Sequence, residues 1–353
     1  MKLLSCLALF ASIIFFPDPA HAWGKWGHVT ICEYSYRLLT DDAKTELNRL
    51  MIEHPAQARL EANRRAESMT SYNYACLYAD SNEYGKRVES PRHYLNLQRS
   101  EPSLPPAECP GDRPCILRGI SEEFAVLRDT SLDDSTRADA LVMLGHWIGD
   151  LHQPLHVSFK DDQGGNHISK LKEGRCSAKN LHAVWDTCIL ERGLFRVRVA
   201  DFAQLNREKR FSSKVYRYVD DIESRYSIEQ LQTLAKPWLE TGPHEWAMES
   251  YQITRMPDVK YCIMENENCS YDTGVTKRPA LGMRKPSRKA PLAERQEYDR
   301  LLYAHNKKVQ IDDAYISKFA PVVETRLMQA AIRLADRLNT ALDPNYNGMP
   351  DFD

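Results

Sequence analysis

Residues 145–156 read GHWIGDLHQPLH and crowd three histidines and an aspartate into one short stretch. A solvated helix face normally carries lysine and glutamate instead. Imidazole and carboxylate groups are ligands for zinc and similar ions, and a helix brings residues i and i+4 to one side. This spacing places His146 and Asp150 on the same side of a helix that Pro154 ends or kinks, with His156 just beyond. The fold must therefore bring further ligands to this stretch.

A second stretch, NLHAVWD, repeats the four-residue spacing with His182 and Asp186. Either pair alone is weak evidence, because an isolated His-x-x-x-Asp is more often an accident or a surface ion pair. Two upstream residues are further candidates: Asp80 ends YAD, and His93 opens HYLNL. The structural alternatives are a helix cap for Asp80 and a hydrogen-bonded, half-buried histidine for His93.

The amino terminus has the pattern of a secretory signal. It has a positive start, an apolar run over residues 3–16 and a small-x-small cleavage site that ends at Ala22. Cleavage there exposes Trp23 as a new terminus in WGKWGH, which also contains His28. A free α-amine and its own carbonyl can chelate a metal; the alternative is that Trp23 is a packed terminal aromatic. We expect an exported protein, secreted or periplasmic, with residues 1–22 removed and residues 23–353 forming one domain.

Charge and cysteine content narrow the class further. The formal net charge is -2, which does not suggest a non-specific polyanion binder, so any affinity for nucleic acid must be local. No segment is long and apolar enough to span a bilayer. Eight cysteines follow the signal, and disulfides are expected in an oxidising compartment. The pairs close in sequence are the natural choices: Cys109/Cys115, Cys176/Cys188 and Cys262/Cys269.

Helical periodicity dominates, and no stretch shows sustained strand alternation. We expect helices over residues 28–40, 40–51, 117–128, 134–152 and 320–342. Thr40 or Asp41 is the candidate cap of the second, and Pro321 is expected near the start of the last. The predicted fold class is therefore all-α, a single mostly helical domain with long loops and disulfides. A basic insertion at about 270–295, containing KRPALGMRKPSRK, is either a solvated loop or an electrostatic guide for a polyanion.

The ordered motifs W-G-x-x-G-H, A-D, H-Y-x-N, H-W-I-G-D-x-x-Q-P-L-H, G-G-N and N-L-H-x-x-W-D resemble the S1/P1 nuclease family. These are exported zinc-dependent nucleases and 3'-nucleotidases that prefer single strands. The resemblance runs from residue 23 to about 190 and resumes at WAMES (246–250) and in the final helix. It implies a mostly helical fold, shared with zinc phospholipase C, that holds three zinc ions in one cleft.

The resemblance also implies a ligand for each ion. The first zinc would be bound by Asp80, His93, His146 and Asp150. The second would be bound by His156, His182 and Asp186. The third would be bound by the amine and carbonyl of Trp23, with His28 and Asp150. His152, His167, His54, His244 and His305 have no counterpart role.

The expected reaction is hydrolysis of single-stranded DNA and RNA, and of 3'-nucleotides, to 5'-phosphorylated products. A hydroxide held between the zinc ions that Asp150 bridges would attack phosphorus, with Asp80 orienting it. Tyr94 would stack on a base and Asn96 would hydrogen-bond its edge; the alternative is that Tyr94 merely packs. We expect a monomer without stable membrane association.

Two departures from the family pattern and two rival functions remain open. Tyr78 stands where the family usually has tryptophan, and Glu83 stands where a basic residue commonly binds phosphate; Lys86 or Arg87 is a possible substitute. A zinc-dependent phospholipase C is the closest rival, and a non-catalytic zinc-sequestering protein is a different class. The tight spacing from Trp23 to the following histidine and the H-Y-x-N stretch favour the nuclease.

Overall fold

The computed structural model describes residues 23–52, 54, 71–80, 90–106, 109–111, 113–170, 176, 178–197, 208–265, 268–270, 287, 290–297 and 308–352. The expected signal at residues 1–22, most of the basic insertion, and Glu83, Lys86 and Arg87 lie outside these residues.

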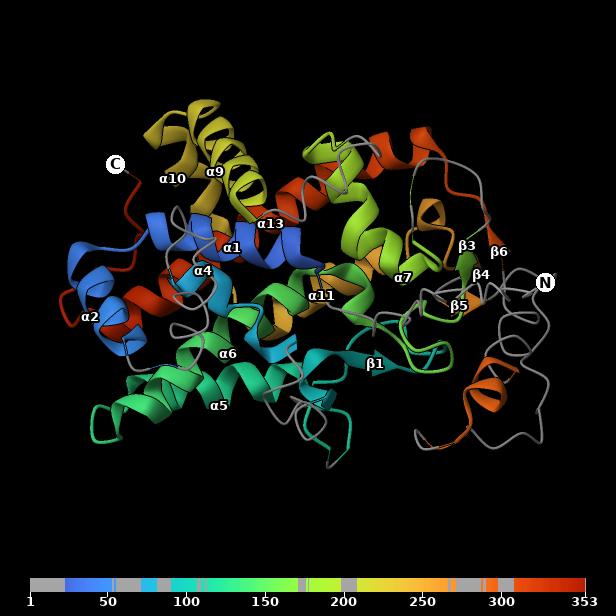
Figure 1. Ribbon diagram of the computed structural model, residues 1–353, viewed down its shortest axis with the longest axis horizontal. Helices are drawn as coiled ribbons and strands as arrows, with labels where there is room; N and C mark the ends of the chain where they lie inside the picture. Colours follow the sequence, from blue (N-terminus) through green and yellow to red (C-terminus); the bar gives the residue numbers. More distant parts are fainter. Residues whose placement is uncertain are drawn as a thin grey trace, which may run out of the picture.

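Helices form the frame of the molecule (Figure 1). The longer ones are α1 (Lys25–Arg37), α2 (Asp41–Met51), α5 (Ile116–Arg128), α6 (Asp134–His152), α9 (Glu208–Ser224), α10 (Ile228–Leu239), α11 (Pro243–Thr254) and α13 (Asp313–Leu342). Short α-helical turns are α4 (Ser71–Ala75) and α7 (Leu181–Ala183). Single 3₁₀ turns are η1 (Tyr78–Asp80), η2 (Ser90–His93), η3 (Pro154–His156) and η6 (Pro257–Val259), while η4 (Val184–Leu194) is a π-helix. The all-α prediction is confirmed.

The described strands form three small two-stranded sheets. β1 (Leu95–Leu97) pairs in parallel with β2 (Val157–Phe159), and β3 (Ser169–Lys170) pairs in parallel with β6 (Lys308–Val309). β4 (Ile263–Glu265) and β5 (Asn268–Ser270) are antiparallel. The first sheet matters for function, because β1 follows η2 and β2 follows η3, and the register opposes Leu95 to Val157. It therefore brings the ends of two 3₁₀ turns side by side.

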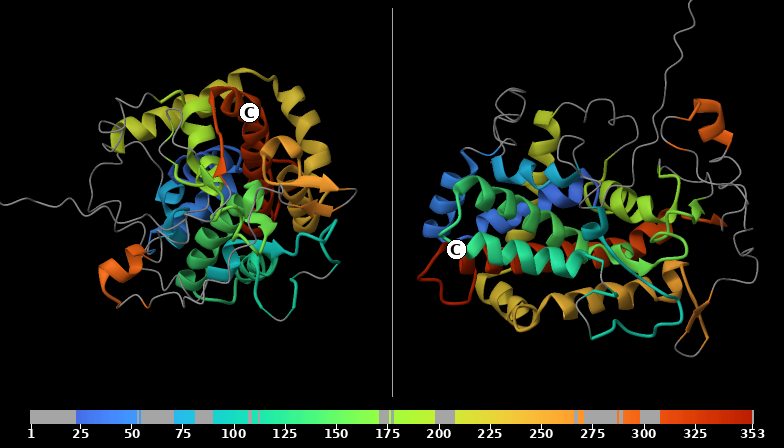
Figure 2. Two further views of the ribbon diagram at one scale, coloured as in Figure 1. Left: turned by 90° about the vertical axis from the view of Figure 1, so that its right-hand side faces the viewer. Right: turned by 90° about the horizontal axis from the view of Figure 1, so that it is seen from below.

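The core is built around α6 and α13. Both pack against α1 and against each other, and α6 also contacts α5 while α13 contacts α10 and η4. The end-on view in Figure 2 shows α13 between the blue α1 and the yellow helices. One side of α13 is an apolar stripe at helical spacing, and its residues are all buried: Val323, Leu327, Ala331, Leu334 and Leu338. From Ala138 to its end, α6 is buried on nearly all sides, which is typical of a central helix.

Helix ends follow their capping residues, with one correction. The side chain of Thr40 accepts a hydrogen bond from the backbone N–H of Ala43, so Thr40 caps α2 as expected. Pro321 does not mark the start of the last helix, because α13 begins at Asp313, where the side chain of Asp312 accepts from the N–H of Tyr315. Pro321 lies in the helix interior, and the cap rather than the proline sets the boundary.

Disulfides tie the irregular segments to this frame. The three expected pairs, Cys109–Cys115, Cys176–Cys188 and Cys262–Cys269, are all formed. A fourth, Cys32–Cys76, joins α1 to the residue that follows α4. It links segments 44 residues apart in the chain and lies directly beside α6, as the next subsection describes.

Candidate metal centre

Three groups of histidine and aspartate meet where α1 begins and α6 ends. In each group the nearest imidazole nitrogens and carboxylate oxygens lie within 4.8 Å of one another. The groups are His28, His146 and Asp150; Asp80, His93 and His146; and His156, His182 and Asp186. Eight of the nine sequence-predicted ligands therefore lie in these groups, with His146 common to two of them.

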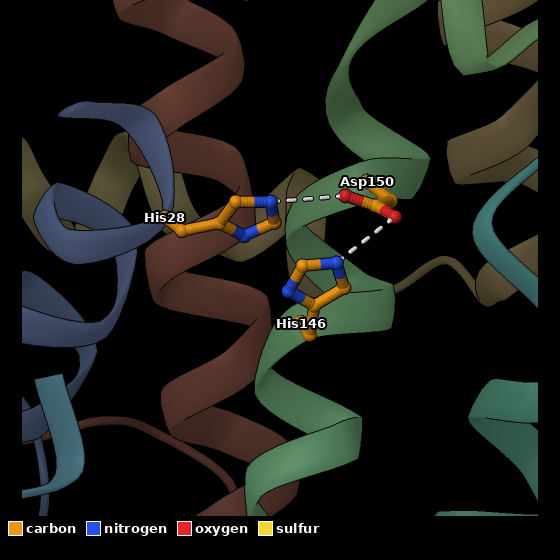
Figure 3. A group of neighbouring side chains, drawn as sticks. All are labelled: His28, His146 and Asp150. Carbon is orange, nitrogen blue, oxygen red and sulfur yellow. Dashed lines mark ion pairs between the residues drawn. The ribbon is translucent and has the colours of Figure 1, made fainter. Parts of the chain in front are cut away.

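Asp150 is the centre of this arrangement. Its Oδ1 lies 3.1 Å from His28 Nε2, and its Oδ2 lies 3.0 Å from His93 Nδ1 and 3.4 Å from His146 Nε2. His156 Nδ1 is 3.7 Å from the same Oδ2. Figure 3 shows His28 reaching from α1 toward Asp150 while His146 rises from the preceding turn of α6. Four imidazoles thus surround one fully buried carboxylate.

Backbone carbonyls orient three of the imidazole rings. A carbonyl only accepts, so the ring nitrogen facing it must be the N–H, and in the neutral ring the other nitrogen then keeps its lone pair. His146 Nδ1 lies 2.7 Å from the Cys76 carbonyl, and His182 Nδ1 lies 2.7 Å from that of Gly164. His156 Nδ1 faces the carbonyl of His93. In each case Nε2 is left as the donor atom, as is usual for histidine ligands of metals.

Several cluster atoms are buried without a hydrogen bond in the described part of the chain. They are both ring nitrogens of His28, Nε2 of His156 and Oδ1 of Asp150. His28 Nε2 and Asp150 Oδ1 form an ion-pair contact at 3.1 Å that does not have the geometry of a hydrogen bond. Unsatisfied buried polar atoms are costly. A divalent cation would satisfy these lone pairs, and nitrogen and oxygen donors suit zinc.

Protonation is unequal around Asp150. Burial and the neighbouring His146 lower the pKa of His28 to about 4. Burial also opposes charge on His146, but Asp150 and Asp80 outweigh it and raise the pKa of His146 to about 9. The rings of His28 and His146 stack with centroids 4.0 Å apart. Two positive charges at this distance repel each other, so His146 holds the proton and His28 is neutral. Burial works against the ionised form of Asp150, yet His146 and His156 hold its pKa well below the usual range.

In the third group, burial shifts the pKa values of His182 and Asp186 in opposite directions, and both shifts disfavour charge. Burial and His156 lower the pKa of His182 to about 3. Burial, together with the charges of Asp150 and Asp80, raises the pKa of Asp186 well above its usual value, although a hydrogen bond from Gln153 lowers it.

The four-residue spacing of His182 and Asp186 predicted one regular α-helix for both residues, and the structure differs. His182 lies in α7 and Asp186 lies in the π-helix η4, with His182 Nε2 3.5 Å from Asp186 Oδ2.

Trp23 lies beside this third group. Its side chain is fully buried, and the next residue, Gly24, donates its backbone N–H to the carbonyl of Asp186 at 2.9 Å. The beginning of the described chain is therefore fixed against a cluster residue. No described contact joins the amine or carbonyl of Trp23 to the cluster, so its ligand role stays a prediction.

The two residues predicted to bind substrate lie at the edge of the cluster. Tyr94 directly follows His93 and is 38% exposed, one of few exposed aromatics in the described chain. Asn96 lies on β1 opposite Ser158, and its Oδ1 is buried without a described partner. Asp80 and His93 each have side chains that are 15% exposed, whereas Asp150 is completely buried. The cluster therefore opens toward Asp80, His93 and Tyr94.

His152 is turned away from the cluster, as expected for a residue without a ligand role. Its Nδ1 lies 2.8 Å from the carbonyl of Ile148, and its Nε2 lies 2.9 Å from Arg333 on α13. Gln153 was not anticipated: its side chain reaches Asp186. The signal that could have revealed it is its place between the predicted ligands Asp150 and His156 in the stretch DLHQPLH.

Two glycines give α1 the room to approach α6. A Cβ on Gly149 would lie 2.8 Å from His28 Nδ1, and one on Gly145 would lie 2.8 Å from the hydroxyl of Tyr72 and 2.9 Å from Cys76 Sγ. Gly145 therefore admits the Cys32–Cys76 disulfide. Gly145 directly precedes His146, and Gly149 directly precedes Asp150. The close packing that these glycines allow therefore also sets the positions of the two cluster residues.

A helical core that buries such groups defines a candidate metalloprotein, and comparison with known proteins narrows the class. Residues 23–281 match the family model described as S1/P1 Nuclease. This chain belongs to the S1/P1 nuclease family.

The individual relatives have low sequence identity to this chain, but some of the alignments are long. The chain is 26% identical to Endonuclease 4 of Arabidopsis thaliana over 335 residues, which cover 91% of this chain and 89% of that protein. Endonuclease 2 of the same organism is 29% identical over 180 residues, 48% of this chain and 57% of that protein. Nuclease S1 of Aspergillus oryzae is 25% identical over 230 residues, 62% of this chain and 74% of that protein. The aligned portion thus spans little more than half of the second relative but nearly all of the first.

We predict that Gly149→Ala displaces His28. The added methyl would overlap the imidazole, so the free energy of unfolding should fall by about 1–3 kcal/mol, although alanine is the better helix former. Urea denaturation of chelator-treated protein measures this change. In a His28→Ala background the overlap is gone, and the same substitution should become neutral or stabilising. An equal cost in both backgrounds would contradict the proposed contact.

Proposed function

We propose that this protein is an exported trinuclear-zinc phosphoesterase. It would hydrolyse single-stranded DNA and RNA to 5'-phosphorylated products and also act on 3'-nucleotides. The observation that carries the proposal is the convergence of three ligand groups on buried carboxylates in a member of the S1/P1 nuclease family. The nine predicted ligands would hold the ions: Trp23, His28, Asp80, His93, His146, Asp150, His156, His182 and Asp186.

The donor set supports zinc. It combines imidazole nitrogens with carboxylate oxygens, and hydrogen bonds to backbone carbonyls preset Nε2 of His146, His156 and His182. Softer sites would use thiolate, and harder ones would use oxygen alone. Every cysteine in the described chain is in a disulfide, so none of these supplies a thiolate ligand.

Within the mechanism, carboxylates and histidines have separate tasks. Zinc, when bound, supplies a Lewis acid that lowers the pKa of a coordinated water to about 7 and offsets phosphodiester charge. Asp150, ionised and buried, would hold two ions together. Asp80 is partly exposed and lies 4.0 Å from His146 Nε2; its carboxylate would accept a hydrogen bond from the attacking water and orient it. No side-chain nucleophile is required.

Substrate choice follows from access. The partly exposed side of the cluster carries Asp80, His93 and Tyr94, whereas its far side is closed by α1 and α6. A regular duplex is stiff and cannot bring a phosphate into a recessed site. A flexible single strand can bend and bring one phosphate to the cluster. Tyr94 would stack on the adjacent base, and the half-buried Asn96 would hydrogen-bond the edge of that base. Single-strand preference would then arise from shape rather than from sequence readout.

Export is the proposed setting. The four disulfides of the described chain are typical of proteins that fold in an oxidising compartment. We propose cleavage after Ala22 and residence in the periplasm or outside the cell. Among the described helices, none has the length and apolar character needed to cross a bilayer.

The assignment predicts a defined pattern of activity in one purified sample. We expect release of 5'-phosphorylated nucleotides from single-stranded DNA and RNA, and of phosphate from a 3'-mononucleotide. Chelation should abolish both, and added zinc should restore both, because the cluster residues alone cannot activate water. Release of choline phosphate from phosphatidylcholine without nucleotide release would instead identify a phospholipase C. Stoichiometric zinc with no hydrolysis of any substrate would indicate a sequestering protein.

The stacking role of Tyr94 predicts a contrast between two substitutions. Tyr94→Ala should raise the KM for short single-stranded oligonucleotides by roughly 5- to 150-fold, which corresponds to the loss of about 1–3 kcal/mol of base stacking. Tyr94→Phe keeps the ring and should remain close to the wild type. Steady-state kinetics on one oligonucleotide provides the comparison. If both variants match the wild type, Tyr94 only packs.

The terminal ligand predicts sensitivity to the position of cleavage. A mature protein with one extra residue ahead of Trp23 loses the free amine that would chelate one ion. We expect it to retain one zinc fewer and to lose most of its activity, as measured by elemental analysis and by the nucleotide assay. An extra residue at the carboxyl end is the matched control and should have no effect. Full activity with three retained ions in the extended protein would show that the terminus is not a ligand.

A further inference from the structure

Gln153 occupies the junction between α6 and η3, and all of its backbone and side-chain polar groups have partners. Its backbone N–H donates to the carbonyl of Asp150 at 3.0 Å, and its carbonyl accepts from the N–H of His156 at 2.9 Å. Its side-chain Nε2 donates to Asp186 Oδ1 at 2.6 Å, and its Oε1 accepts from the N–H of Leu155 at 2.6 Å. The residue is fully buried. One glutamine therefore touches three of the cluster residues.

The local sequence fixes where Gln153 stands. A residue before proline disfavours the helical conformation, and Gln153 accordingly leaves α6 with φ -82° and ψ 114°. Pro154 then opens η3, and the Gln153 side chain turns back to cap it through Leu155. Gln153 is thus both the residue at which α6 ends and the residue that caps η3.

The cap also fixes which way the amide points. The N–H of Leu155 can only donate, so it requires the amide oxygen on its side. The amide NH₂ must then face Asp186, and it does so at hydrogen-bonding distance. A flipped amide would lose both bonds and bring its oxygen against a carboxylate oxygen. Buried amides with both ends occupied have a single orientation.

This bond selects which oxygen of Asp186 faces the cluster. Oδ1 is held by Gln153, and Oδ2 is left 3.5 Å from His182 Nε2. Without the amide, the carboxylate could rotate about its side-chain bonds. Groups that hold a metal ligand in place commonly contribute 10- to 100-fold to metal affinity.

We propose that Gln153 is a positioning residue that fixes the His156–His182–Asp186 group relative to Asp150. Its backbone connects Asp150 to His156, and its side chain connects the same junction to Asp186. The inference rests on the proposed function, because it assumes that this group holds an ion. The alternative is that Gln153 only caps η3 and fills space.

Two substitutions separate positioning from capping. Gln153→Glu keeps an oxygen for the N–H of Leu155 but replaces the donor that faces Asp186 with a second carboxylate oxygen. Gln153→Met has similar volume and loses both side-chain bonds. Gln329→Met is the matched control, because Gln329 is also buried and hydrogen-bonded, to Arg326 on the same helix α13. Circular dichroism and the Tm of the chelator-treated proteins report on folding separately from metal.

The experiment compares zinc retention in the four full mature proteins. Each is loaded with zinc at pH 8, dialysed against chelators of graded strength, and analysed for bound metal. We expect both Gln153 variants to lose one ion at chelator strengths 10- to 100-fold weaker than the wild type requires, while the other ions stay. The metal-free Tm of Gln153→Glu should fall, because the variant buries a second carboxylate against Asp186, so zinc retention is compared at temperatures at which circular dichroism shows every variant folded. Gln329→Met should retain every ion.

Two results would overturn the inference, and they are distinguishable. If the wild type and both Gln153 variants hold all ions with equal affinity, Gln153 does not position the group. If Gln153→Met fails to fold, Gln153→Glu alone decides between these outcomes. If the wild type itself holds no stoichiometric metal, the proposed function falls, and the inference falls with it.

Discussion

The burial of the Asp150 carboxylate constrains the rest of the structure. A carboxylate removed from water is costly unless opposite charge and hydrogen-bonding partners compensate. Four imidazoles surround it, and His146 keeps a proton with a pKa of about 9 because Asp150 is ionised. The proton on His146 therefore compensates the charge of the Asp150 carboxylate. Metal binding would replace this proton with a cation as the positive charge that compensates Asp150.

The packing of the core serves this charge arrangement. α1 and α6 approach closely only because Gly145 and Gly149 have no side chains at the contact. Gly145 leaves space for the Cys32–Cys76 disulfide, and the carbonyl of Cys76 in turn orients His146. The short β1–β2 pair places His156 Nδ1 against the carbonyl of His93. The packing of the core thus fixes the orientation of His146 and of His156 within the cluster.

Much of this was accessible from the sequence. Apolar periodicity and capping residues predicted α1, α2, α5 and α6 closely, because local spacing decides which face of a helix is buried. The start of α13 was predicted wrongly, because Pro321 was read as an initiator although Asp312 caps the helix. The π-helix η4 was missed, because it leaves no local signal and depends on packing against α1 and α13. Gln153 was missed for a related reason, since its partner Asp186 is distant in sequence.

The gradient of exposure across the cluster links structure to reaction. Asp150, His28 and His146 are sealed within the helices, where low solvent access strengthens electrostatic interactions. Asp80 and His93 reach the surface beside Tyr94, so these residues form the exposed rim of the cluster. A rim residue that is not itself a predicted ligand, such as Tyr94, can change without loss of the cluster, whereas the sealed residues depend on one another. Variation in substrate preference within such a fold is therefore expected at the rim, and the departures at Tyr78 and Glu83 fall close in sequence to Asp80.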